Sequence, residues 1–83
     1  MNDHILREAI ARCRRGDWDG AHGLVNDEER DALAMWVHAW LHRIEGDLGN
    51  ARYWYRKAGR APFDGTIEAE REALLAAVEA RAP

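Results

Sequence analysis

The chain has 83 residues, which is enough for one domain with a small hydrophobic core. Its formal net charge is −3 with acidic and basic residues interspersed, a composition that argues against nucleic acid as a partner. One cysteine, no apolar run of the roughly 18 residues that a membrane span requires and no signal peptide predict a cytoplasmic protein without disulfide bonds.

The first 25 residues predict a helical hairpin, about 4–25. Apolar residues recur at spacings of three and four over about 4–15, which is typical of an amphipathic helix. Gly16-Asp17 ends this helix, because glycine adopts the left-handed conformation at helix ends and aspartate accepts backbone N–H bonds at the next helix start. A short second helix over about 18–25 completes the hairpin.

A second hairpin is expected over about 28–59. Its first helix, about 28–45, is preceded by Asn26 and Glu29, which have the spacing of a capping pair. The helix carries one broad apolar stripe, which predicts that this side is buried. The members of the stripe are Leu33, Trp36, Val37, Trp40, Leu41 and Ile44.

The glycine–aspartate turn recurs thirty residues along the chain, at Gly46-Asp47. It separates the helix just described from another over about 48–59. Pro62 follows, and proline disfavours helical backbone in the residue before it. A last helix over about 67–81 has an acidic start, which suits the helix dipole, and apolar residues farther along.

Four tryptophans stand out in so short a chain: Trp18, Trp36, Trp40 and Trp54. Each can bury about 150–250 Å² of surface, so we expect all four to stabilise the core. Cys13 lies on the apolar side of the first helix and is expected to be a small buried hydrophobic residue.

The second turn and the helix after it resemble the second helix of a tetratricopeptide repeat. The shared residues, in order, are Gly46, Leu48, Ala51, Tyr55, Ala58 and Pro62. The first turn repeats the opening half of this pattern, so the resemblance covers residues 5–62. It implies an all-α fold: a single domain over 1–83 with two antiparallel hairpins and a C-terminal capping helix, about five helices in a short solenoid.

Two features depart from the tetratricopeptide pattern. The period is 30 residues rather than 34, so a regular superhelix is not expected. His38 and His42 stand where that pattern has a leucine and an aromatic residue, which places two imidazoles at packing positions. Buried polar groups of this kind need hydrogen-bond partners or a function.

A second resemblance covers about residues 36–63. This segment is similar to one in bacterial and fungal proteins without an assigned activity, which reads W-H-x-x-x-H-R-x-E-x-D-x-x-N-A-x-Y-W. The similarity implies no reaction, but it singles out the polar residues between His38 and Trp54.

Polar side chains follow one side of the helix expected over 28–45. His38, His42 and Glu45 stand at i, i+4 and i+7, and the two imidazoles lie about 5–6 Å apart at Cβ. That separation allows both to bind one divalent metal ion such as zinc, with Glu45 as an oxygen ligand. Residues placed to complete the coordination are Asp47, Asn50 and Tyr53. The structural alternative is that both histidines hydrogen-bond to neighbouring helices or to Glu45.

We expect a tetratricopeptide-like interaction module of the bacterial cytoplasm that binds a peptide or protein partner in a groove. The groove residues are His38, His42, Arg43, Glu45, Asn50 and Tyr53. For Arg43, the alternative is an internal ion pair with Glu45 or Asp47. Two hairpins leave apolar surface that the last helix or a homo-oligomer would cover.

The alternative function is a small metal- or ligand-binding protein that uses the same histidines. Catalysis is the less expected outcome, because a chain of 83 residues would need an oligomer to enclose a pocket from water. No cofactor other than such a divalent metal is expected.

Overall fold

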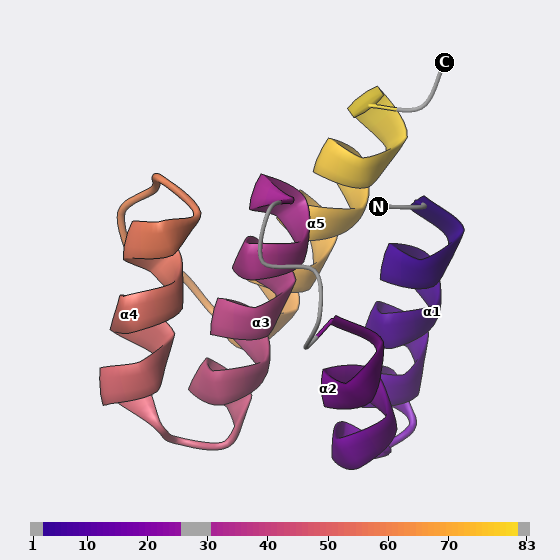
Figure 1. Ribbon diagram of the computed structural model, residues 1–83, viewed down its shortest axis with the longest axis horizontal. Coiled ribbons are helices and arrows are strands. Elements are labelled where there is room, and N and C mark those ends of the chain that lie inside the picture. Colours follow the sequence, from indigo (N-terminus) through magenta and orange to yellow (C-terminus); the bar gives the residue numbers. More distant parts are fainter. Residues whose placement is uncertain (1–2, 26–30, 82–83) are drawn as a thin grey trace.

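Five helices form the secondary structure of residues 3–25 and 31–81, which are the residues that the computed structural model describes. They are α1 (Asp3–Arg14), α2 (Trp18–Val25), α3 (Ala32–Ile44), α4 (Leu48–Lys57) and α5 (Ile67–Arg81). Helices α1 and α2 form one antiparallel hairpin, α3 and α4 form another, and α5 follows (Figure 1). The predicted all-α fold is therefore confirmed.

The two glycine–aspartate turns have the same geometry. Gly16 and Gly46 have φ angles of 84° and 81°, in the left-handed region that favours glycine. In each turn the amide of the following aspartate donates to the carbonyl five residues earlier, at 2.8 and 2.9 Å. The carboxylates of Asp17 and Asp47 then accept the backbone N–H three residues farther on, at 3.1 and 3.3 Å. One local sequence thus ends one helix and caps the next, as predicted.

The start of α3 differs from the prediction. Helix α3 begins at Ala32, and Asp31 is its N-cap with an extended backbone, φ −101° and ψ 115°. The Asp31 carboxylate accepts the amide of Leu33 at 2.9 Å. A helix running from residue 28 through this position is therefore wrong. The predicted capping pair, Asn26 and Glu29, lies outside the described residues.

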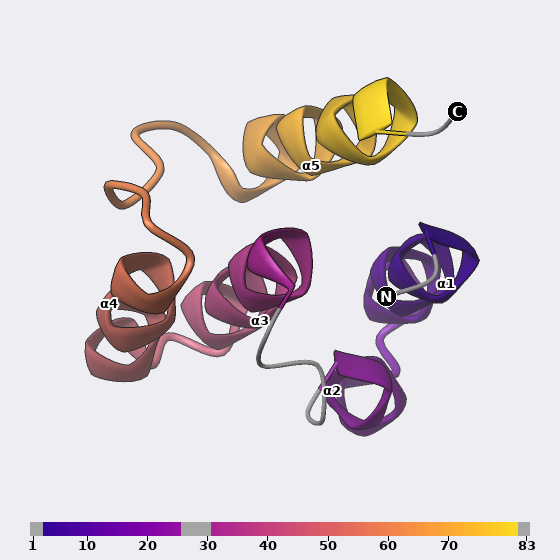
Figure 2. The same ribbon diagram turned by 45° about the horizontal axis from the view of Figure 1, so that its top comes forward.

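Helix α3 is the centre of the molecule. It contacts α1, α2, α4 and α5, and its residues from Ala34 to Leu41 are all buried. Trp40 is 2% exposed, and its Nε1 donates to the Ile67 carbonyl at the start of α5, at 3.1 Å. Helix α5 contacts both α3 and α1, so it covers the side on which the two hairpins meet (Figure 2).

The tryptophans are not all core residues. Trp36 and Trp40 are buried, but Trp54 is only partly buried and Trp18 is 39% exposed. The expectation that Trp18 is a core residue is wrong. Trp18 is the N-terminal residue of the short helix α2, where neighbouring side chains enclose only part of its ring. Cys13 is buried as expected, and burial raises the pKa of its thiol to about 12.

A buried carboxylate joins α3, α4 and α5. Glu70 is fully buried in α5, where its Oε2 accepts from Trp36 Nε1 at 2.9 Å and from the Tyr55 hydroxyl. Its Oε1 accepts from Arg43 Nη1 at 2.8 Å, and Arg43 Nη2 donates to the Gly65 carbonyl. Burial, and then the bond to Glu70, raise the pKa of Tyr55 above its usual range. One side chain thus satisfies donors from two other helices.

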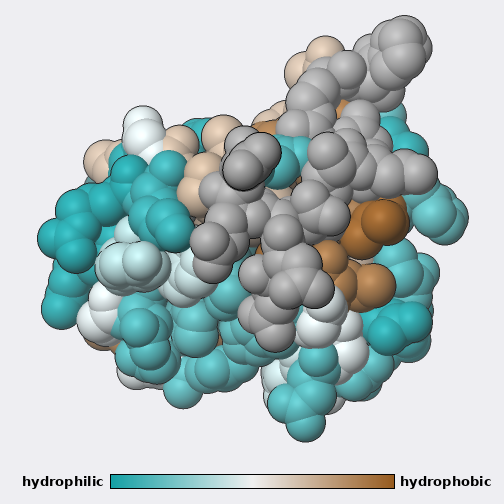
Figure 3. All heavy atoms as spheres, in the orientation of Figure 1, coloured by the Kyte–Doolittle hydropathy of each residue, from teal (hydrophilic) through white to brown (hydrophobic). Residues whose placement is uncertain are grey.

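The surface is mostly hydrophilic in the face that Figure 3 draws, with hydrophobic residues gathered on the α1 side. Within the described residues, no helix combines the length and the apolar character that crossing a bilayer would require.

Candidate metal centre

Three histidines from two helices converge beside α3. His22 comes from α2, and His38 and His42 come from successive turns of α3. One ring nitrogen of each lies within 4.8 Å of the corresponding nitrogens of the other two. The ring centroids are 4.9 Å apart between His38 and His42, 4.9 Å between His22 and His42, and 5.2 Å between His22 and His38. We call these residues the histidine cluster.

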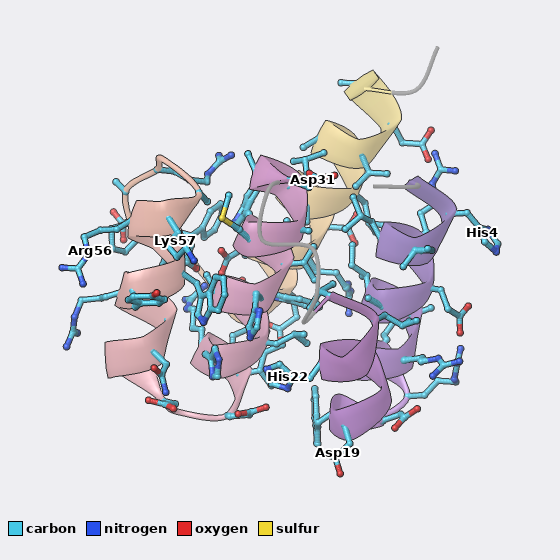
Figure 4. The ribbon with its side chains drawn as sticks, in the orientation of Figure 1. His4, Asp19, His22, Asp31, Arg56 and Lys57 are labelled. Atoms are coloured by element: carbon cyan, nitrogen blue, oxygen red, sulfur yellow. The ribbon has the colours of Figure 1, made fainter. Side chains whose placement is uncertain are left out.

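Local structure explains why these side chains meet. Four-residue spacing stacks the His38 and His42 rings, with an interplanar angle of 15°. The turn after α1 directs α2 back along the bundle, where α2 contacts both α1 and α3. His22 then lies between α2 and α3 (Figure 4). Small, fully buried neighbours in both helices, Ala21 and Ala39, leave room for this close approach.

An indole ring from α4 closes one side of the cluster. Trp54 stacks on His38 with a centroid distance of 4.0 Å and an interplanar angle of 10°. His38 is consequently only 6% exposed. Lys57 extends over the Trp54 ring, with its Nζ 4.9 Å from the centroid (Figure 4).

The buried position of His38 determines its protonation state. Burial, followed by the neighbouring His42, His22 and Lys57, lowers the pKa of His38 to about 4. Burial and the nearby His22 also lower the pKa of His42, against the opposite effect of two carboxylates. At neutral pH these two rings are uncharged, which is the form in which imidazole binds metal ions.

Carboxylates lie on the outer side of the cluster. Glu45 Oε1 is 3.1 Å from His22 Nδ1, and because a carboxylate only accepts, this contact favours a proton on Nδ1. Nδ1 of His42 lies 3.8 Å from a carboxylate oxygen of Glu45 and 3.8 Å from one of Asp47, beyond hydrogen-bond distance.

Two nitrogens of the cluster have no hydrogen-bond partner among the described residues. They are His22 Nε2 and His42 Nδ1, and both are buried from solvent. Buried polar atoms in folded proteins are almost always paired, and these two nitrogens remain available to water or to a ligand.

The structure brings together some of the residues that the sequence singled out and separates others. His38 and His42 lie together, whereas Glu45 contacts His22 and lies 3.8 Å from His42 but is not among the ligand atoms that converge. Asn50 donates its side-chain amide to the Asp47 carboxylate at 2.7 Å, within the cap of α4. Tyr53 is 46% exposed and lies edge-on to the neighbouring indole, at a centroid distance of 5.3 Å.

Arg43 belongs to a different part of the molecule. It forms an internal ion pair, but its partner is Glu70. The predicted pairing with Glu45 or Asp47 is wrong, because Arg43 is next to His42 on the helix and so points toward α5 rather than toward the cluster.

His22 was not predicted as a site residue. Its signal lies in its spacing: it stands next to the buried Ala21 and three residues before the buried Val25, on the side of α2 that faces the bundle. The remaining histidine, His4, lies on α1, away from the cluster (Figure 4).

Comparison of the chain with protein-family models, with curated proteins and with solved structures found no match. The function is therefore inferred from the geometry of the site.

Proposed function

We propose that the protein binds a divalent transition-metal ion, Zn²⁺ in the first instance, through His22, His38 and His42. The observation that carries this proposal is the convergence of three imidazoles, from two helices, with their ring nitrogens within 4.8 Å of one another.

The spacing suits a metal site after a small adjustment. Nitrogens that bind one zinc ion at about 2.0–2.1 Å in tetrahedral geometry lie about 3.4 Å apart. Partly buried rings can rotate about their side-chain torsions, and such rotation would bring the nitrogens from their present separations, within 4.8 Å, to the spacing that zinc requires. His22 and His42 are both partly buried, whereas the fully packed His38 is fixed between His42 and Trp54.

The surroundings support the same role. In metal sites, a carboxylate commonly holds the ring nitrogen of a ligating histidine that faces away from the metal. The contact between Glu45 and His22 Nδ1 has this arrangement and leaves the buried, unpartnered His22 Nε2 for coordination. Three nitrogen ligands leave a fourth position on zinc for water or another ligand. The donor set is also acceptable to Ni²⁺ and Cu²⁺.

Calorimetric titration of chelator-treated protein with ZnCl₂ tests the proposal. We expect one zinc ion per chain, and binding at least about tenfold weaker in His22→Ala and in His42→Ala. His4→Ala is the matched control, because it removes a histidine outside the cluster, and it should bind as the unchanged protein does. Equal binding by His22→Ala and the unchanged protein would refute the three-histidine site.

The peptide- or protein-binding module predicted from the sequence stays a second proposal. Of its expected groove residues, the exposed ones are Glu45, Asn50 and Tyr53. Exposure leaves these side chains available to a partner, whereas His38 is covered by Trp54.

A further inference from the structure

The side of the molecule on which α1 and α5 pack together carries a groove of about 350 Å³. The two helices lie next to each other in both ribbon views and run antiparallel, with Arg7 of α1 paired to Glu79 near the end of α5 (Figures 1 and 2). Four arginines line the groove: Arg7 and Arg14 from α1, Arg15 from the turn after α1, and Arg71 from α5.

This concentration of positive charge is unusual for the chain. Four of its twelve basic residues line one groove, although the net charge is −3. The other residues that line it among those described are Ile10, Ala11 and Leu75, so the groove has an apolar floor and no carboxylate in its wall.

Carboxylates at the rim occupy only part of each guanidinium. Among the described residues, three of these arginines contact a carboxylate through one terminal nitrogen, Nη2: Arg7–Glu79 at 2.8 Å, Arg15–Glu8 at 3.2 Å and Arg71–Glu72 at 3.6 Å. A guanidinium has five N–H donors, so donors remain for a ligand. The Nε atoms of Arg7 and Arg71 are buried without a hydrogen-bond acceptor among the described residues.

We propose that this groove binds a small organic anion with a phosphate or carboxylate group and an apolar portion. The anionic group would accept from Arg71 and Arg14, with Arg7 and Arg15 on either side. The apolar portion would lie on the floor formed by Ile10, Ala11 and Leu75. Guanidinium matches the geometry of both oxyanions, and the volume is within the range of small-molecule sites. The site is separate from the histidine cluster, since none of the cluster residues lines it.

Titration monitored by NMR at low ionic strength, with a chelator present, tests this site. The probes are phenyl phosphate, benzoate and inorganic phosphate, and benzyl alcohol serves as the uncharged control. We expect saturable binding of phenyl phosphate or benzoate, weaker binding of inorganic phosphate and none of benzyl alcohol. The difference between the two aromatic anions identifies which oxyanion is preferred.

Arginine variants locate the binding. Arg71→Gln and Arg14→Gln should each weaken phenyl phosphate binding about tenfold or more, because each removes a charged hydrogen-bond donor. Arg14 is exposed, so its replacement tests the site even if the Arg71 variant folds poorly. Arg56→Gln makes the same charge change on the outer side of α4 and should have less than about a twofold effect (Figure 4).

The proposal fails if no probe saturates in the millimolar range, or if Arg56→Gln weakens binding as much as Arg14→Gln does. It also fails if His42→Ala abolishes binding of phenyl phosphate, because the anion would then occupy the histidine cluster.

Discussion

Glu70 determines how the polar groups of the core are satisfied. Its two carboxylate oxygens accept from Trp36, Arg43 and Tyr55, which belong to two other helices. An unpaired buried charge is costly, so the four side chains depend on one another. A carboxylate in this position favours one arrangement of α3, α4 and α5 over others in which the donors would be left unpaired.

Replacement of Glu70 should therefore be strongly destabilising. We expect Glu70→Ala to lower the free energy of unfolding by about 3–5 kcal/mol, because Arg43 would remain without its buried partner. Urea unfolding followed by circular dichroism measures the loss. Glu68→Ala, an exposed acidic residue two positions earlier in α5, is the control and should cost less than about 1 kcal/mol. Equal losses would show that Glu70 does not hold the helices together.

His38 should make the stability of the metal-free protein depend on pH. Its pKa is about 4 when folded, against an ordinary value of 6.5, owing to burial and to His42, His22 and Lys57. Between these values the unfolded chain binds a proton that the folded chain does not. Stability should therefore fall as pH is lowered from 6.5 toward 4, by up to about 3 kcal/mol, and should not change through this group above 6.5.

Chemical unfolding at several pH values, with a chelator present, separates this effect from other titrations. The His38→Gln variant lacks the titrating ring, so its stability should fall less over pH 6.5 to 4. Glu8 and Asp47, whose pKa values are lowered by hydrogen bonds, contribute equally to both proteins. The explanation is wrong if the two proteins show the same slope.

Helix α3 is the element on which the fold depends. Its buried residues face four neighbouring helices, and Trp40 both fills the core and donates to the first residue of α5. We expect Trp40→Ala to cost about 3–5 kcal/mol, enough to unfold most of a domain of this size. Circular dichroism and thermal unfolding provide the measurement. A helical, cooperatively unfolding Trp40→Ala protein would contradict the central role of this side chain.

The elements with local signals were predictable from the sequence. The glycine–aspartate turns and the apolar stripe of α3 depend on residues close together in the chain, and all of them are found. The start of α3 was misplaced because several acidic and polar residues compete as caps before Ala32, and only the fold selects Asp31.

The roles of two residues, His22 and Glu70, could not be predicted from local turn signals or helical periodicity. His22 and Glu70 are polar residues on bundle-facing sides of α2 and α5. Their roles depend on partners 15 or more residues away in other helices, His38 and His42 for one and Trp36, Arg43 and Tyr55 for the other. Helical periodicity gives the side on which a residue lies, but not the side chain that it meets.

At the scale of the whole molecule, the histidine cluster links the two hairpins. His22 belongs to the first, and His38 and His42 belong to the second, so a bound ion would join α2 to α3. Helix α2 has only eight residues, two of them glycines that lower helix stability. A metal that binds only the folded state stabilises it by mass action.

Zinc should therefore protect α2 from local opening more than it protects α5. We expect amide hydrogen exchange in α2 to slow at least about tenfold with saturating zinc, because opening of this helix would break the bond to His22. Exchange in α5, which supplies no ligand, should change less. A chelator should reverse the difference, and uniform slowing across both helices would indicate that the ion acts only on global unfolding.

The indole of Trp54 lies flat against the His38 ring, where it is placed to respond to changes in that ring. We expect gain of a proton or of a metal ion at that ring to change the emission of Trp54, against the emission of the other three tryptophans. Zinc binding at the proposed centre should then be observable in unlabelled protein, in dilute solution and in real time.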